Sequence, residues 1–163
     1  MPASSRLPEL GKRGQGWVAV QSILILSLVP ATLSEIDWPG SVGSTLTVLG
    51  LVLVASGLLL LIAAGASLAF ARAASMLPSP RTGSRVAQRG AYRVVRHPIY
   101  GAVLLLAVGA SLATSPLALA PTILLAAVFD LKARVEEAWL RERDAAYDAY
   151  RARTPRRFVP GVY

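Results

Sequence analysis

The longest uncharged run in this sequence, residues 45–71, restricts the possible folds more than any other feature. It contains no charged side chain and is rich in leucine and valine. About 20 apolar residues are enough for an α-helix to cross the hydrocarbon core of a bilayer, so this run is long enough to span a membrane with tilt. A helix on the surface of a soluble protein would carry a polar face, which this run lacks. The sequence therefore predicts an integral membrane protein.

Three further apolar stretches accompany this run, which gives predicted spans at about 17–34, 45–71, 99–114 and 116–131. The first contains only Gln21 and Pro30 as interruptions, and the last two are short and form a predicted helical hairpin. A signal peptide is the alternative for the first stretch, but no small-x-small cleavage pattern follows Pro30. We predict an all-α membrane protein of about four transmembrane helices. Residues 1–16 form its cytoplasmic N-terminal segment, 17–163 a single domain, and 132–163 a cytoplasmic C-terminal helical segment.

The basic residues are confined to one set of loops. All 17 lysines and arginines precede the first span, lie between the second and third, or follow the fourth. The opposite loops carry only Glu35 and Asp37. This positive-inside pattern predicts that both termini are cytoplasmic. For most of these residues, topology and attraction to anionic lipid are a sufficient explanation.

Composition excludes several kinds of chemistry. The chain has no cysteine, which rules out a disulfide framework, a thiolate nucleophile and a cysteine-ligated metal. With His97 as its single histidine, it offers a poor ligand set for zinc, and we predict no metal site. The expected partners are the lipid bilayer and a lipophilic or lipidated substrate, and no nucleic acid.

Polar and aromatic residues gather just before the third span. After a helix-breaking loop at 77–84, the segment 90–101 places His97 and Pro98 directly at the start of the apolar stretch. Pro98 suits the first turn of a helix and favours an extended conformation for His97. The N–H groups at such a helix start favour an anion, for example a carboxylate.

A second polar group follows the fourth span. Because no proline or glycine occurs from Thr122 to Arg153, we expect one continuous helix that leaves the membrane there. Acidic and basic residues four positions apart on this helix are expected to pair on its surface. These pairs are Lys132 with Glu136, Asp130 with Arg134, and Glu137 with Arg141. Taken alone, this pattern indicates a salt-bridged, solvated helix.

Together the two segments resemble the isoprenylcysteine carboxyl methyltransferase and phospholipid methyltransferase family over about residues 77–163. The matching residues form an ordered series: Gly90, Tyr92, Arg93, Arg96, His97, Pro98 and Tyr100, then Glu136, Glu137 and Leu140, then Tyr147 and Tyr150 before a basic, proline-containing end. The resemblance implies transmembrane helices whose cytoplasmic ends and C-terminal segment enclose S-adenosylmethionine. It also implies an S-adenosylmethionine-dependent methyltransferase that acts on a lipophilic acceptor, either an isoprenylcysteine-type carboxylate or a lipid amine.

The resemblance also assigns residues. The cofactor contacts that it implies are Val86, Ala87, Tyr92, His97, Pro98, Ile99, Tyr100, Glu136 and Glu137. For binding of the acceptor, Lys132 stands where the prenylcysteine enzymes have an arginine. Arg134 is the alternative residue for this role, and the resemblance also implies a catalytic role for it. His97 is either the base for an amine acceptor or a cofactor ligand.

Two other functions remain open at this level. One is a membrane reductase that uses NADPH and resembles the sterol reductases, and the other is a non-catalytic scaffold that recruits anionic lipid. The composition, rich in arginine and alanine, suggests a bacterial inner membrane protein. Small residues in the second span permit association with another helix or another copy.

Overall fold

The computed structural model describes residues 10–11, 14–71 and 88–161 of the 163-residue chain. Its described residues form helices and no strand, which confirms the all-α prediction. The five α-helices and two short 3₁₀ helices are α1 (Gln15–Thr32), α2 (Gly40–Ala71), η2 (Gly90–Arg93), α3 (Pro98–Ala113), η3 (Pro116–Ala118), α4 (Leu119–Arg143) and α5 (Tyr147–Arg153). The predicted loop at 77–84 lies outside the described residues.

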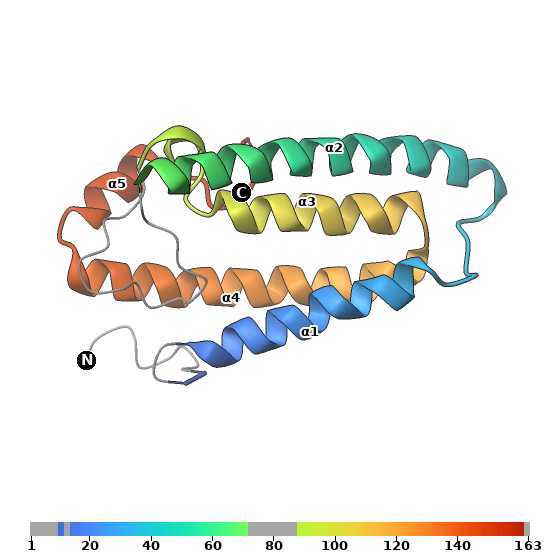
Figure 1. Cartoon of the computed structure of the whole chain (residues 1–163), viewed down its shortest axis with the longest axis horizontal. Helices are drawn as coiled ribbons and strands as arrows, with labels where there is room; N and C mark the ends of the chain where they lie inside the picture. Colours follow the sequence, from blue (N-terminus) through green and yellow to red (C-terminus); the bar gives the residue numbers. More distant parts are fainter. Residues whose placement is uncertain (1–9, 12–13, 72–87, 162–163) are drawn as a thin grey trace.

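Helices α1 to α4 lie side by side in an elongated bundle (Figure 1), with α2 packed on α3 and α1 packed on α4. Small residues bring α2 and α3 close together. A Cβ added to Gly50 would lie 2.5 Å from the carbonyl oxygen of Gly109, and one on Gly57 would lie 3.0 Å from the carbonyl oxygen of Ala102. Larger side chains at these positions would separate the two backbones. The small residues of the second span therefore serve helix packing, as predicted.

Within the part of the chain that the structure describes, three helical stretches are long and apolar enough to cross a membrane: α1, α2 and Pro116–Arg143. Many large apolar side chains on α1 and α2 are exposed in the isolated chain, as expected for surfaces that face lipid. Helix α3 is apolar but has only 16 residues, about 24 Å at 1.5 Å per residue. The count of four spans therefore stays a prediction.

The predicted continuous helix from Thr122 to Arg153 is wrong. Helix α4 ends at Arg143, and Asp144 adopts an extended backbone with φ −137°. The Asp144 carboxylate accepts a hydrogen bond from the backbone N–H of Ala146, and its carbonyl accepts one from that of Tyr147, both at 2.9 Å. This turn allows α5 to fold back across the end of the bundle, where Tyr147 and Tyr150 become buried.

The chain after α5 is fixed to the start of α3. The backbone N–H groups of Arg96 and His97 donate to the carbonyls of Arg156 and Arg157 at 3.0 and 2.7 Å. Gly101 leaves room for this segment, because a Cβ there would collide with the carbonyl oxygen of Phe158. The Phe158 side chain then packs into the core between α3 and α4. The C-terminal segment thus completes the end of the bundle that carries the polar residues.

Candidate functional site

His97 lies between two adjacent glutamates of α4. As predicted, it directly precedes Pro98, the first residue of α3. Its Nδ1 is 3.4 Å from Oε2 of Glu136, and its Nε2 is 3.2 Å from Oε1 of Glu137. Burial alone lowers the pKa of His97, but hydrogen bonds and charge from both glutamates outweigh it, so the pKa is raised above its ordinary value. The arrangement favours an imidazolium that donates to both carboxylates.

Tyr100 connects this pair to the apolar core. Its hydroxyl donates to Oε1 of Glu136 at 2.6 Å. Its ring stacks between His97 and Phe129, with ring centroids 5.3 and 4.6 Å away. The Nζ of Lys132 lies 4.9 Å from the centroid of the same ring. An acidic, an aromatic and a basic group therefore meet within one turn of α3 and two turns of α4.

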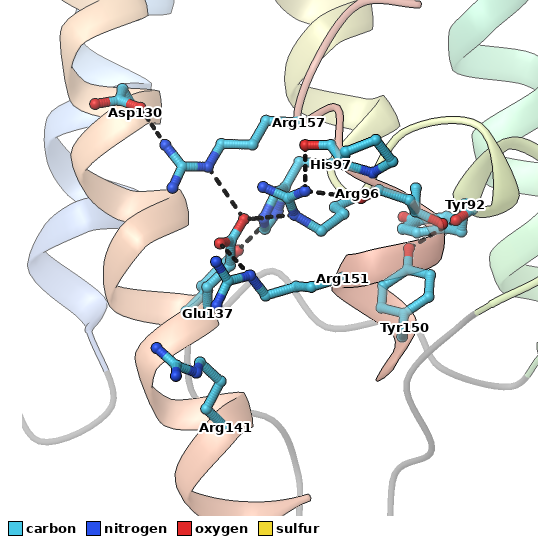
Figure 2. A network of polar contacts seen from close by, with 12 residues as sticks. Tyr92, Arg96, His97, Asp130, Glu137, Arg141, Tyr150, Arg151 and Arg157 are labelled. Carbon is cyan, nitrogen blue, oxygen red and sulfur yellow. Dashed lines mark hydrogen bonds and ion pairs between the residues drawn. The ribbon is translucent and has the colours of Figure 1, made fainter. Parts of the chain in front are cut away.

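Glu137 has a different role from Glu136, because it is surrounded by arginines (Figure 2). Its carboxylate accepts from Nε of Arg96 at 2.9 Å and from Nε of Arg157 at 3.2 Å, and Nε of Arg151 lies 3.9 Å away. Arg96 also donates to the carbonyls of Thr154 and Pro155 at 2.7 and 2.5 Å. We call Arg96, Glu137 and Arg157 the arginine clamp, since they join α4 to the C-terminal segment.

The expected surface pairs along α4 are only partly present. Asp130 pairs with Arg134 at 2.7 Å, as predicted. Glu137 instead takes the partners of the arginine clamp, and Arg141 pairs with Asp148 of α5 at 2.9 Å. Lys132 donates to Oε1 of Gln21 on α1 at 2.6 Å. The picture of a solvated, self-paired helix is therefore wrong here, because Lys132 and Glu137 are buried and have partners on other elements.

The structure brings together most of the predicted site residues. The contacts above connect five of them in one group: His97 contacts Glu136 and Glu137, Tyr100 contacts Glu136, and Lys132 lies over the ring of Tyr100. Pro98 is buried at the first turn of α3, and Ile99 follows it, half-buried.

Four predicted positions are placed less directly or not at all. Tyr92 accepts a hydrogen bond from Tyr150 at its carbonyl, at 2.6 Å. Burial, with smaller contributions from the charges of Tyr150 and Glu136, raises the pKa of the Tyr92 phenol. Arg134 lies on an exposed face and pairs with Asp130, away from the contacts of His97 and Glu136. Val86 and Ala87 lie outside the described residues.

Sequence reasoning missed four participants: Gln21, Arg96, Phe129 and Arg157. Gln21 had a usable signal, since it is a lone amide within an apolar run. Arg96 stood within the recognised motif, but nothing in the sequence indicated that it would bind Glu137. Arg157 and Phe129 carried no signal at all.

Comparison with known families settles what kind of protein this is. Residues 47–144, more than half of the chain, match the family described as phospholipid methyltransferase. The chain belongs to the phospholipid methyltransferase family. This confirms the resemblance predicted from the motifs and makes the protein a member of a family of membrane methyltransferases. No significant similarity to a curated protein or to a solved structure was found.

The match covers most of α2 and all of α3 and α4, including the site residues on α3 and α4. His97, Tyr100, Lys132, Glu136 and Glu137 all lie within it. Helix α1 and the C-terminal segment lie outside it. The site of this phospholipid methyltransferase family member is therefore built from a matched centre, with Gln21 and Arg157 added from unmatched flanks.

Proposed function

We propose that this protein transfers a methyl group from S-adenosylmethionine to a lipophilic acceptor that reaches the site from the bilayer. The observation that carries the proposal is the group of Glu136, His97 and Tyr100 at the start of α3, within the region that matches a methyltransferase family.

The residues present fit the amino-acid end of this cofactor, which carries an ammonium and a carboxylate. Glu136 contacts Tyr100 and His97, and its side chain is 13% exposed, whereas Glu137 is 6% exposed and satisfied by the arginine clamp. Glu136 is thus the better candidate to accept the ammonium. The first-turn N–H groups of α3, at Ile99 and Tyr100, precede its first intrahelical bond and suit the carboxylate.

When bound, S-adenosylmethionine supplies a methyl group activated by a sulfonium. For an in-line transfer of this methyl group, the chain would have to orient donor and acceptor and exclude water. The ring of Tyr100 offers an aromatic face to a cation. A histidine held between two carboxylates retains its proton, which supports binding and positioning, and not proton removal, as the role of His97.

For the acceptor side, we assign Lys132 in preference to Arg134. The Lys132 side chain is buried beside the Tyr100 ring, on the helix that carries Glu136. Arg134 lies half-exposed on another face of α4, with Asp130 as its partner. A positive charge beside the site suits an acceptor with a negatively charged headgroup.

Calorimetry on detergent-purified protein tests the cofactor assignment. S-adenosylhomocysteine is expected to bind, and Glu136→Gln to weaken binding roughly tenfold to a hundredfold, since a charge-assisted hydrogen bond is lost. Glu142→Gln, which alters an exposed carboxylate of the same helix, is the control and is expected to bind normally. Binding of NADPH in place of S-adenosylhomocysteine, or unchanged affinity in Glu136→Gln, contradicts the assignment.

A further inference from the structure

Arg157, in the C-terminal segment, binds two carboxylates of α4 at once. Its Nη1 donates to Oδ1 of Asp130 at 2.9 Å, and its Nε donates to Oε1 of Glu137 at 3.2 Å (Figure 2). Asp130 and Glu137 are seven residues apart, which is two turns along one face of α4. A planar guanidinium with several fixed donors suits such a bridge better than the point charge of a lysine. Arg157 therefore fixes the Glu137 carboxylate in one place along α4.

The same residue also holds the backbone of His97. The backbone N–H of His97 donates to the carbonyl oxygen of Arg157 at 2.7 Å. The His97 ring contacts Glu137 through Nε2 at 3.2 Å, so the side chain of Arg157 reaches this ring through a single carboxylate. Arg157 is thus bound to the main chain of His97 directly and to its imidazole through Glu137.

The other side of the His97 ring contacts Glu136, the proposed cofactor ligand. Nδ1 lies 3.4 Å from Oε2 of Glu136, whose second oxygen accepts from the hydroxyl of Tyr100. The ring also stacks on that of Tyr100, with centroids 5.3 Å apart. Rotation of the imidazole would separate Nδ1 from Oε2. Since binding groups are kept in place by supporting bonds of this kind, the contacts from Arg157 to Glu136 form one continuous series.

The C-terminal segment has other attachments besides the Arg157 side chain. Arg96 donates to the carbonyls of Thr154 and Pro155, and its backbone N–H donates to the carbonyl of Arg156. The side chain of Phe158 packs into the core between α3 and α4. None of these bonds uses the guanidinium of Arg157. Its effect on His97 can therefore be separated from the docking of the segment.

We propose that Arg157 is a positioning residue of the cofactor site: through Glu137 it fixes the ring of His97, and this ring holds Glu136 where it accepts the ammonium of the cofactor. The step that concerns the ammonium rests on the proposed function, whereas the orientation of the ring does not. Arg157 lies outside the family match, which ends at residue 144. The C-terminal segment thus contributes to the site a residue that the matched region lacks.

Nuclear magnetic resonance of the purified full chain in detergent, without cofactor, tests the orientation of the ring. His97 is the single histidine, so isotope labelling of histidine reports one ring and one backbone N–H once the purification tag is removed. At about pH 5.5, below the ordinary pKa of histidine, the ring is charged in every variant. In wild type, both ring N–H protons and the backbone N–H are expected to exchange slowly with water.

Arg157→Gln is expected to exchange the Nε2 proton of His97 roughly tenfold faster than wild type, while the backbone N–H stays protected. The control Arg156→Gln removes an exposed arginine of the same segment and is expected to resemble wild type. Unchanged exchange of the Nε2 proton in Arg157→Gln overturns the proposal. Equal acceleration of the ring and backbone protons also overturns it, because the side chain would then only fasten the segment.

Calorimetry with S-adenosylhomocysteine tests the step from the ring to Glu136. Arg157→Gln is expected to bind about threefold to tenfold more weakly than wild type. Adding Arg157→Gln to Glu136→Gln is expected to weaken binding no further, since Arg157 acts through that carboxylate. Additive losses in the double variant overturn the proposal. Absence of binding by wild type, with the expected exchange rates, contradicts the proposed function and the cofactor step alone, and leaves the orientation of the ring supported.

Discussion

Glu136 and Glu137 are adjacent in sequence and differ completely in surroundings. Successive residues point about 100° apart around a helix, so one carboxylate faces Tyr100 and the other faces the C-terminal segment. His97 contacts both. We assign Glu136 to the cofactor and Glu137 to the architecture because their partners differ.

Protonation of His97 gives stability a pH dependence that can be measured. The pKa of His97 is raised in the folded chain, because the two glutamates outweigh the effect of burial. Protonated His97 therefore contributes stability that is fully present below about pH 6.5, its value in an unfolded chain, and is lost as pH rises through the raised folded value. We expect the Tm of wild type to fall across that range and the Tm of His97→Gln to change less. Equal slopes for the two proteins would contradict the ion pairs.

For individual residues, the sequence predicted which residues belong to the site better than it predicted their contacts. The motif identified His97, Tyr100 and Glu136, because their types and order resemble a known family. The motif could not predict that Arg96 and Arg157 bind Glu137. Arg96 is 41 positions from Glu137 in the sequence, and Arg157 is 20 positions from it. Such pairs depend on how α5 and the C-terminal segment fold back, which no local pattern encodes.

Among the elements, the C-terminal segment depends most on a few polar bonds. The arginine clamp links it to α4, and two backbone bonds link it to the start of α3. Because Arg96 and Glu137 are each only 6% exposed at the side chain, solvent screens their interaction weakly.

We expect Glu137→Gln to lower the free energy of unfolding by about 3 kcal/mol, since removing one charge of a buried pair leaves the other uncompensated. Denaturation in detergent, monitored by circular dichroism, measures this change. Glu142→Gln on the exposed surface of α4 serves as the control and is expected to unfold like wild type. A Glu137→Gln variant as stable as wild type would show that the clamp does not hold the segment.

Apolar runs predicted the helices well but not every boundary. The first and third predicted spans agree with α1 and α3 to within two residues, because each run is bordered by polar or turn-forming residues. Helix α2 begins at Gly40, ahead of the predicted start at residue 45. The break after Arg143 was not predicted because no proline or glycine marks it. A hydrogen bond from the backbone N–H of Ala146 to the Asp144 carboxylate and the burial of Tyr147 stabilise the turn instead.

For the whole molecule, the segregation of charge predicts a topology in the membrane. The candidate site lies at the end of the bundle where α4 ends and α5 begins, and the loop with Glu35 and Asp37 connects α1 to α2 at the opposite end (Figure 1). The basic residues predict that the end with the site is cytoplasmic.

Single cysteines test this topology cleanly, because the chain has none of its own. Asp37 and Asp148 are both exposed, at opposite ends of the bundle. We expect a membrane-impermeant maleimide to label Asp37→Cys in intact cells and Asp148→Cys only after the membrane is opened. The reverse pattern would place the site on the outer side, away from the cellular methyl donor.

The central claim is that this family member methylates a lipophilic acceptor with S-adenosylmethionine, and transfer of a labelled methyl group tests it most directly. Purified protein in lipid vesicles is incubated with the methyl-labelled donor, and label is counted in the extracted lipid. We predict label in the lipid fraction with wild type, and a roughly tenfold to hundredfold lower rate with Glu136→Gln. No labelled lipid with folded wild type across phosphate-bearing and carboxylate-bearing lipids, or equal rates for the two proteins, would contradict the account.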